Sequence, residues 1–231
     1  MPSWTETLKE AARPIWEAIF AHPFVTGLGD DTLPADRFRY FLGQDYVYLQ
    51  DFSQVLAMGA VRTAHRSDEP LFLRHALTVH EVEADLHRTL APAYGLSPAD
   101  LAATPPGPIT VAYTDHLVRA AWSRPFAVLV AAVLPCYWIY REVGRRLAER
   151  PLPDTPAYRE WIATYAGAPY GEAVDEILAV ADRVGEHLGP DEARLGLKAF
   201  WRSSRYEWLF WEQAWSLEQS LAAARLPGEP G

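Results

Sequence analysis

The stretch from Arg124 to Gly144, RPFAVLVAAVLPCYWIYREVG, decides the fold. Its first half is apolar on every side, which is the pattern of a helix that other helices surround. Pro135 lacks a backbone donor, so the carbonyl of Ala131 loses its usual partner and the helix should bend beside Cys136. We therefore expect residues 124–144 to form the most buried helix of the protein, with the bend turning the thiol of Cys136 toward the interior that the helices enclose.

The rest of the chain repeats the helical period. No stretch shows sustained alternation of apolar and polar residues between turn signals, so we predict an all-α fold, a multi-helix bundle in a single domain over residues 1–231. Ser3 and Glu6 form a capping-box pattern, and Pro14 should kink or restart the first helix. The expected helices cover roughly residues 3–22, 34–56, 70–90, 109–122, 124–144, 156–166, 170–188 and 190–225, with a short Ser97-capped turn before the proline-rich connection at 104–110.

Charge and composition exclude several classes of protein. The formal net charge is -9, and only two of the 21 basic residues are lysines, so no basic stripe is available for nucleic acid. No run of about 18 apolar residues lacks a charge or a helix breaker, and the N-terminus has no basic segment followed by an apolar one. We expect a soluble, cytoplasmic protein. The single cysteine, Cys136, excludes an intramolecular disulfide and a multi-cysteine metal site.

Two carboxylates lie on apolar helix faces. Asp45 falls on the apolar stripe of the segment 41–52, FLGQDYVYLQDF, and Glu207 shares a face with Phe200 and Phe210. Burying an ionised acid costs several kcal/mol unless it is paired or faces a polar cavity. A paired core acid would explain either residue alone, whereas two such acids favour a shared cavity. Asp51 lies off the stripe, and we expect it to be more exposed and dispensable.

Aromatic hydroxyls accompany the lone thiol. Tyr140 lies one helical turn after Cys136, and Tyr48, Tyr113 and Tyr165 fall on the presumed inner stripes of three other helices. An inert buried cysteine and ordinarily packed tyrosines are the alternative interpretation. Together, however, these side chains could line a slot for a flat heterocycle.

A weaker metal-site pattern occurs at 80–87, HEVEADLH. His80, Glu83 and His87 have i, i+3, i+7 spacing and would share one helix face, as two imidazoles and a carboxylate on a metal require. A solvated helix face gives the same pattern, and no ligand from another helix is identifiable, so we assign no metal. The GLGDD at 27–31 is no dinucleotide fingerprint, because no strand precedes it and the third glycine is missing.

Four stretches resemble one family: HPFV at 22–25, YFLGQDYVYLQDF at 40–52, LPCYWIYREVG at 134–144 and RSSRYEWLFWEQAW at 202–215. Their order and spacing resemble the thiaminase II (TenA) family, in its cysteine-containing branch. The resemblance covers nearly the whole chain. It implies a haem-oxygenase-like all-α fold, no cofactor, and a homotetramer, for which the tryptophan-rich segment 208–215 would suit an interface.

The same resemblance implies an activity. The family hydrolyses thiamin, or 4-amino-5-aminomethyl-2-methylpyrimidine as the salvage substrate, to 4-amino-5-hydroxymethyl-2-methylpyrimidine. The resemblance implies that Cys136 is the nucleophile toward the pyrimidine ring and that Glu207 is the acid/base. It also implies that the carboxylate of Asp45 holds the 4-amino group. The residues that match the hydroxyl-bearing aromatics of the family's substrate pocket are Tyr48, Tyr113, Tyr140 and Tyr165.

Chemistry independent of the resemblance supports part of this hypothesis. A thiol with an ordinary pKa near 8.5 is a poor nucleophile at neutral pH, so substrate binding, a nearby tyrosine or Glu207 should assist its deprotonation. Two other functions stay open: a metal-dependent oxygenase using His80, Glu83 and His87, and a non-catalytic pyrimidine-binding regulator. A haem oxygenase would need a proximal histidine, but His22 precedes Pro23, where helix capping is the simpler role.

Overall fold

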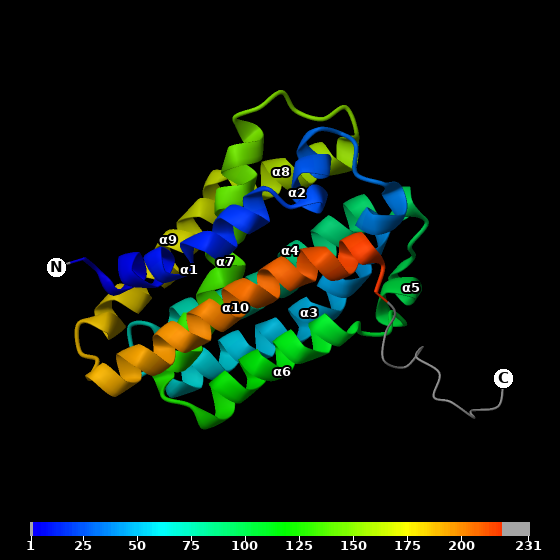
Figure 1. Ribbon diagram of the computed structural model, residues 1–231. Coiled ribbons are helices and arrows are strands. Elements are labelled where there is room, and N and C mark those ends of the chain that lie inside the picture. The colour runs from blue at the N-terminus through cyan, green and yellow to red at the C-terminus, as the bar shows by residue number, and fades with distance from the viewer. Residues whose placement is uncertain (1, 219–231) are drawn as a thin grey trace, which may run out of the picture.

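The protein is a bundle of long α-helices (Figure 1). The structure is a computed structural model that describes residues 2–218, and for residues 82–88 it describes the backbone alone. Within that range the elements are α1 (Trp4–Phe20), α2 (Pro23–Gly29), α3 (Ala35–Arg62), α4 (Glu69–Leu90), a 3-10 turn (Ala91–Tyr94), α5 (Pro98–Ala102), α6 (Pro108–Ser123), α7 (Phe126–Ala148), α8 (Pro156–Ala166), α9 (Ala168–Gly185) and α10 (Pro190–Ser216). No strand occurs among them, so the all-α prediction is confirmed.

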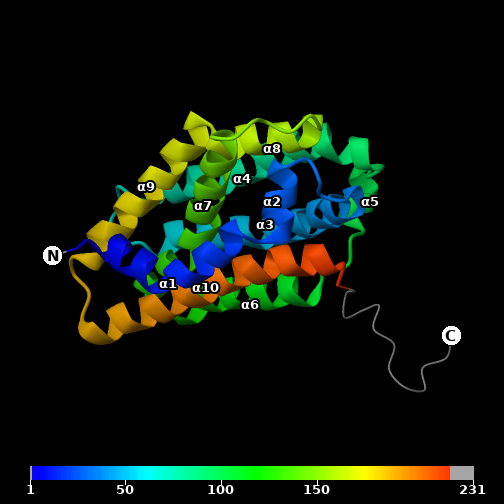
Figure 2. The same ribbon diagram turned by 45° about the horizontal axis from the view of Figure 1, so that its top comes forward.

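Helix α7 occupies the centre of the bundle. It packs against α10, α8, α9 and α6, while α3 pairs with α4 and α6, and α1 lies along α10 (Figure 2). The apolar composition of α7 would by itself allow a membrane span, but 83% of its most apolar window is buried inside the protein. The burial expected for the segment 124–144 is therefore confirmed, and α7 is a core helix.

Two prolines lie inside helices without ending them. α1 runs continuously through Pro14, and its start carries the predicted capping box, in which Ser3 accepts from the Glu6 backbone and the Glu6 carboxylate accepts from the Ser3 backbone. α7 likewise continues through Pro135. The residues that each helix buries, one stripe of α1 and most of α7, stabilise it enough to outweigh the loss of one hydrogen bond per proline.

Helix α2 was not predicted from the sequence. The chain was expected to leave its first helix near His22, and instead a new helix starts there. His22 Nδ1 accepts a hydrogen bond of 3.1 Å from the backbone N–H of Phe24, and Pro23 follows at the first helical position. His22 therefore does cap a helix, but at the start of α2 and not at the end of the first helix, where the sequence predicted it and where Ala21 is the cap. The end of the last predicted helix, at 219–225, lies outside the described residues.

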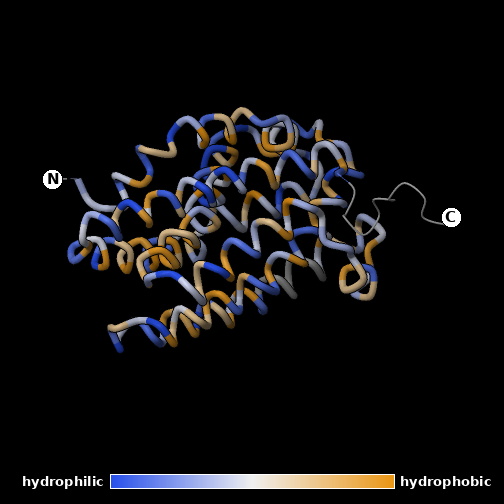
Figure 3. Tube along the Cα trace, turned by 60° about the horizontal axis from the view of Figure 1, so that its bottom comes forward, coloured by the Kyte–Doolittle hydropathy of each residue, from blue (hydrophilic) through white to orange (hydrophobic). Residues whose placement is uncertain are grey.

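A close contact between α7 and α8 sets one wall of the interior. A Cβ atom on Gly144 would lie 2.7 Å from the carbonyl carbon of Tyr165, so only glycine lets the two backbones approach this closely. Figure 3 shows polar and apolar residues alternating along the helices, as in amphipathic helices that bury one stripe. The apolar stripes meet in one core around α7.

Candidate active site

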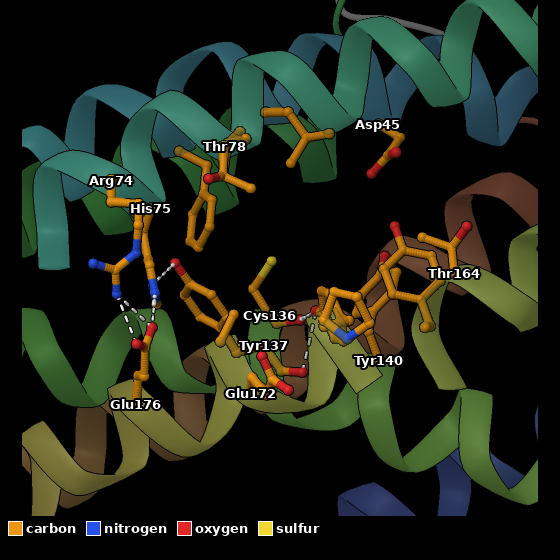
Figure 4. A pocket seen from close by; sticks show the side chains of 17 residues that line it. Asp45, Arg74, His75, Thr78, Cys136, Tyr137, Tyr140, Thr164, Glu172 and Glu176 are labelled. Carbon is orange, nitrogen blue, oxygen red and sulfur yellow. Dashed lines mark hydrogen bonds and ion pairs between the residues drawn. The ribbon is translucent and has the colours of Figure 1, made fainter. Parts of the chain in front are cut away.

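A cavity of about 300 Å³ opens between α3, α4, α7, α8 and α9 (Figure 4). Its wall is mostly apolar and aromatic, with a few polar side chains that converge on it, as in small-molecule sites. Four of the residues predicted from the sequence line it: Asp45 from α3, Cys136 and Tyr140 from α7, and Tyr165 from α8. Asp45 and Tyr165 are separated by 120 positions in the chain, so only the folded bundle brings them together.

The thiol of Cys136 points into this cavity (Figure 4). It follows Pro135 on the cavity side of α7, as the sequence predicted, and the hydroxyl of Tyr170 donates to the Cys136 carbonyl at 3.1 Å. Cys136 keeps some accessible surface because it faces the cavity, yet protein otherwise encloses it. The sulfur is therefore reachable by a ligand in the cavity and poorly solvated by water.

Burial makes the thiol of Cys136 a weak acid. It raises the pKa of Cys136 well above its usual value, the charge of Glu207 raises it further, the nearby Tyr48 hydroxyl lowers it in part, and Asp45 raises it slightly. Tyr48 acts in the direction expected of a nearby tyrosine, but burial and Glu207 outweigh it, and the Tyr48 hydroxyl has no regular hydrogen-bond partner among the described residues. A carboxylate at Glu207 opposes a thiolate, so Glu207 can assist only by accepting the thiol proton.

Glu207 is a buried acid with an unusual pKa. Burial raises the pKa of Glu207 to about 8, while a hydrogen bond from Tyr113 lowers it and the Asp45 carboxylate raises it. The Tyr113 hydroxyl donates to Glu207 Oε1 at 2.6 Å. At neutral pH the Glu207 side chain is therefore mostly protonated, and it can exchange a proton near pH 8.

Three predicted pocket residues lie behind the cavity wall. Tyr48, Tyr113 and Glu207 are buried, but they do not line the cavity. The rings of Tyr48 and Tyr113 pack with centroids 5.0 Å apart, and the Tyr113 hydroxyl is occupied by Glu207. The sequence placed both tyrosines on inner stripes correctly, but an inward-facing residue can contact another helix instead of a cavity. These three side chains are a buried polar layer next to Cys136.

The contrast between Asp45 and Asp51 follows the prediction. Asp45 is 4% exposed and lines the cavity, whereas Asp51 on the same helix is half-buried and does not. The Asp45 charge raises the pKa of the Tyr165 and Tyr140 hydroxyls, although burial raises both more. Asp45 is thus an acceptor aimed at the same space as the thiol.

The predicted metal pattern receives no support from the part that the structure describes. His80 is exposed on α4, and the side chains of Glu83 and His87 lie outside the described residues. Among the described side chains, no group of three potential ligands could hold a metal ion. His22, the candidate haem ligand, is occupied by the α2 cap and by Glu212, whose Oε2 lies 3.0 Å from Nε2.

Sequence reasoning missed one polar cluster at the cavity. His75 of α4, Tyr137 of α7 and Glu176 of α9 all line it and are joined by hydrogen bonds. One signal was present, because His75 lies three positions after Phe72 on the buried face of α4. Its partners were not readable, since they come from helices 62 and 101 residues away in the chain.

The fold and cavity define the class of protein: an all-α bundle with a cysteine, a buried acid and several tyrosines at one internal site. A domain with a heme oxygenase-like fold from Shewanella denitrificans superimposes with a TM-score of 0.73 at 11% identity, covering 92% of each chain, which establishes the fold alone. The TENA/THI-4/PQQC family matches residues 9–217, and the chain belongs to this family.

Individual relatives agree with the family. The chain is 38% identical to an aminopyrimidine aminohydrolase of Bacillus subtilis, covering 93% of this chain and 91% of that protein. It is 36% identical to an aminopyrimidine aminohydrolase of Halalkalibacterium halodurans, covering 93% and 96%. Among solved structures, a TenA family transcription regulator from Silicibacter sp. TM1040 has a TM-score of 0.84 at 30% identity, covering 91% of this chain and 96% of that one.

Proposed function

We propose that this protein is an aminopyrimidine aminohydrolase of thiamin salvage. Its reaction would convert 4-amino-5-aminomethyl-2-methylpyrimidine, and thiamin, to the hydroxymethyl pyrimidine. The observation that carries the proposal is the placement of the Cys136 thiol and the Asp45 carboxylate on the wall of one aromatic cavity. The two aminopyrimidine aminohydrolases at 38% and 36% identity support it.

The proposed mechanism begins at Cys136. The sulfur adds to an electron-poor carbon of the pyrimidine, and a proton reaches a ring nitrogen as the electrons arrive there. The ionised form of Glu207, which becomes populated near pH 8, takes the proton from the thiol and returns it at the ring, so Glu207 is a carboxylate before and after the transfer. The bond to the leaving group then breaks, which leaves an exocyclic methylene for water to attack. Expulsion of the Cys136 thiolate restores the aromatic ring, and the proton on the ring nitrogen returns through Glu207 to the sulfur.

A direct assay tests the activity. The protein is incubated separately with thiamin and with the aminomethyl pyrimidine, and the rate of hydroxymethylpyrimidine formation is compared. We expect product from the aminomethyl compound, and the ratio of the two kcat/KM values gives the preferred leaving group. No product from either compound would contradict the proposed function. The metal-dependent oxygenase alternative would instead require stoichiometric iron in the purified protein.

Asp45 is the proposed clamp for the 4-amino group. Replacing Asp45 by asparagine should raise KM roughly 10-fold or more, because a hydrogen bond to a charged partner contributes about 1.5–3 kcal/mol. Asp51→Asn is the matched control on the same helix, and its KM should stay within about twofold. Steady-state kinetics on both variants measures the difference. An unchanged KM for Asp45→Asn would show that the clamp lies elsewhere.

The assembly and location are further proposals. We propose a cytoplasmic homotetramer, supported by large apolar side chains that the described chain leaves exposed, among them Val61 at 77% and Trp122 at 70%. The segment 208–215 is less suited to an interface than expected, because Trp211 is fully buried and Trp208 and Trp215 are half-buried. Light scattering on the purified protein gives the number of subunits.

A further inference from the structure

A chain of three hydrogen-bonded groups runs from the protein surface to the cavity. Glu176 Oε2 lies 2.9 Å from His75 Nε2, and His75 Nδ1 lies 3.1 Å from the Tyr137 hydroxyl. Glu176 is 44% exposed, whereas His75 is 4% exposed and Tyr137 is 6% exposed. Figure 4 shows the chain beside Cys136, with the Tyr137 hydroxyl aimed at the imidazole. These groups connect solvent with the interior of the cavity.

The protonation of each group follows from its neighbours. The hydrogen bond from His75, together with Arg74, lowers the pKa of Glu176, so this carboxylate is ionised and can only accept. Arg74 Nη2 lies 2.7 Å from both Glu176 oxygens and fixes the carboxylate. Burial lowers the pKa of His75 more than Glu176 raises it, so the imidazole is neutral at pH 7.

The direction of the hydrogen bonds is then determined. The neutral imidazole carries its hydrogen on Nε2 and donates to Glu176, which leaves Nδ1 as an acceptor. The Tyr137 hydroxyl must therefore donate to Nδ1, and its oxygen keeps lone pairs for a proton from the cavity. The arrangement has the logic of a hydroxyl, an imidazole and a carboxylate in series, in which the carboxylate orients the imidazole and stabilises its protonated form.

The proposed reaction leaves one proton without an acceptor. Glu207 handles the proton that moves between the thiol and the ring, and it lies in the buried layer formed with Tyr48 and Tyr113. The water that attacks the methylene must also lose a proton, in the part of the cavity that the leaving group vacates. Tyr137 is adjacent to Cys136 in α7 and lines the cavity, and its interactions extend to Glu176 and not toward Glu207.

We propose that Tyr137, backed by His75 and Glu176, takes the proton from the water that attacks the exocyclic methylene carbon. This inference rests on the proposed hydrolase function. Tyr137 is then a catalytic residue, whereas His75 and Glu176 act through it as positioning residues. The proposal assigns the two proton transfers of the reaction to two separate groups, Glu207 for the ring and Tyr137 for the water.

The step balances in protons and electrons. The water oxygen forms a bond to the methylene carbon, and the π electrons of the methylene move into the ring. The proton of the water passes to the Tyr137 oxygen while the Tyr137 proton passes to His75 Nδ1. The imidazolium lies beside the ionised Glu176. Its proton then goes to the released ammonia, which becomes ammonium, or to solvent through Glu176, and the ring electrons expel the Cys136 thiolate.

The test separates attack by water from the earlier steps. Hydroxylamine is a neutral nucleophile whose nitrogen lone pair is free, so it can attack the methylene without a base, in the place that the leaving amine vacates. The protein, Tyr137→Phe and His75→Ala are each incubated with the aminomethyl pyrimidine and hydroxylamine, and the hydroxymethyl and hydroxyaminomethyl products are quantified. In Tyr137→Phe the ratio of hydroxylamine product to water product should rise about 100-fold, the size of a general-base effect.

His75→Ala and a control variant distinguish a catalytic effect from a structural one. His75→Ala should show the same change in ratio, and added imidazole, filling the space left by the side chain, should restore the water product. Tyr158→Phe is the matched control, because the buried Tyr158 hydroxyl also donates a hydrogen bond, 2.9 Å to the Leu33 carbonyl, and Tyr158 does not line the cavity. Its product ratio should equal that of the unmodified protein.

Each outcome decides between the two proposals. An unchanged product ratio in Tyr137→Phe, including an equal loss of both products, would overturn the role of Tyr137 while leaving the hydrolase intact. If the unmodified protein forms neither product, the hydrolase function itself fails and the proton transfer fails with it.

Discussion

Replacing Cys136 by serine is expected to lower kcat by about a thousandfold or more, because a hydroxyl is a far weaker nucleophile toward the ring than a thiolate. The substitution changes one atom at the cavity wall, so folding should be preserved. Steady-state turnover and a thermal unfolding curve measure the two effects. Full activity in the variant would exclude covalent catalysis by Cys136.

The state of the thiol before substrate binds can be measured on the same protein. Because burial and Glu207 raise the pKa of Cys136, alkylation by iodoacetamide should be slow at neutral pH and should increase only above about pH 9. Such a profile means that Cys136 is not activated in advance and that its deprotonation depends on substrate. Alkylation that titrates well below pH 9 would contradict the structure's account of the thiol.

Replacing Glu207 by glutamine is expected to lower kcat/KM by about 100-fold to 10,000-fold, the range of general acid–base catalysis. The pH profile carries the more specific result. Attack on the ring requires that Cys136 and Glu207 together hold one proton and not two. Below about pH 8 both groups are protonated, so the pair is then inactive. Activity of the unmodified protein should therefore rise with pH up to about 8 and level off, and the glutamine variant should lack this rise.

Stability provides an independent check on Glu207. Its folded-state pKa of about 8 lies above the ordinary value of 4.5, so the native protein holds a proton that the unfolded chain releases between these values. The contribution of Glu207 to the free energy of unfolding is fully present below about pH 4.5 and is lost as the pH rises through about 8. The glutamine variant should therefore unfold at a higher temperature than the unmodified protein at pH 9, and the difference should vanish in acid. Parallel melting curves across pH would refute an elevated pKa.

The sequence predicted the helices well because their signals are local. Capping at Ser3 and Ser97 and the apolar run at 124–144 each depend on neighbouring residues, and the structure confirms them. The helix beginning at Pro23 was missed because a histidine cap is an unusual signal. The buried acids at Asp45 and Glu207 were found because each contradicts its apolar surroundings, and Cys136 was found because it follows a proline inside the most apolar helix.

The helical periodicity of the sequence could not predict which side chains contact one another. The sequence assigned Tyr48 and Tyr113 to the same pocket as Tyr165, but which inward side chain meets a cavity depends on how helices dock. The contact of Gly144 with Tyr165 illustrates this, because one glycine decides how near α8 comes to α7. His75 was missed for a similar reason, since a histidine on a helix becomes informative only when its partners are known.

The cavity wall draws on five helices that are scattered along the chain, α3, α4, α7, α8 and α9. No smaller part of the bundle contains the complete wall, so a ligand bound there should have little affinity for partly folded forms. Occupancy is then linked to cooperative unfolding of the entire molecule, and a ligand at one hundred times its Kd adds about 2.7 kcal/mol to global stability. A collection of pyrimidines could accordingly be ranked by melting temperature alone, even on variants that no longer turn over.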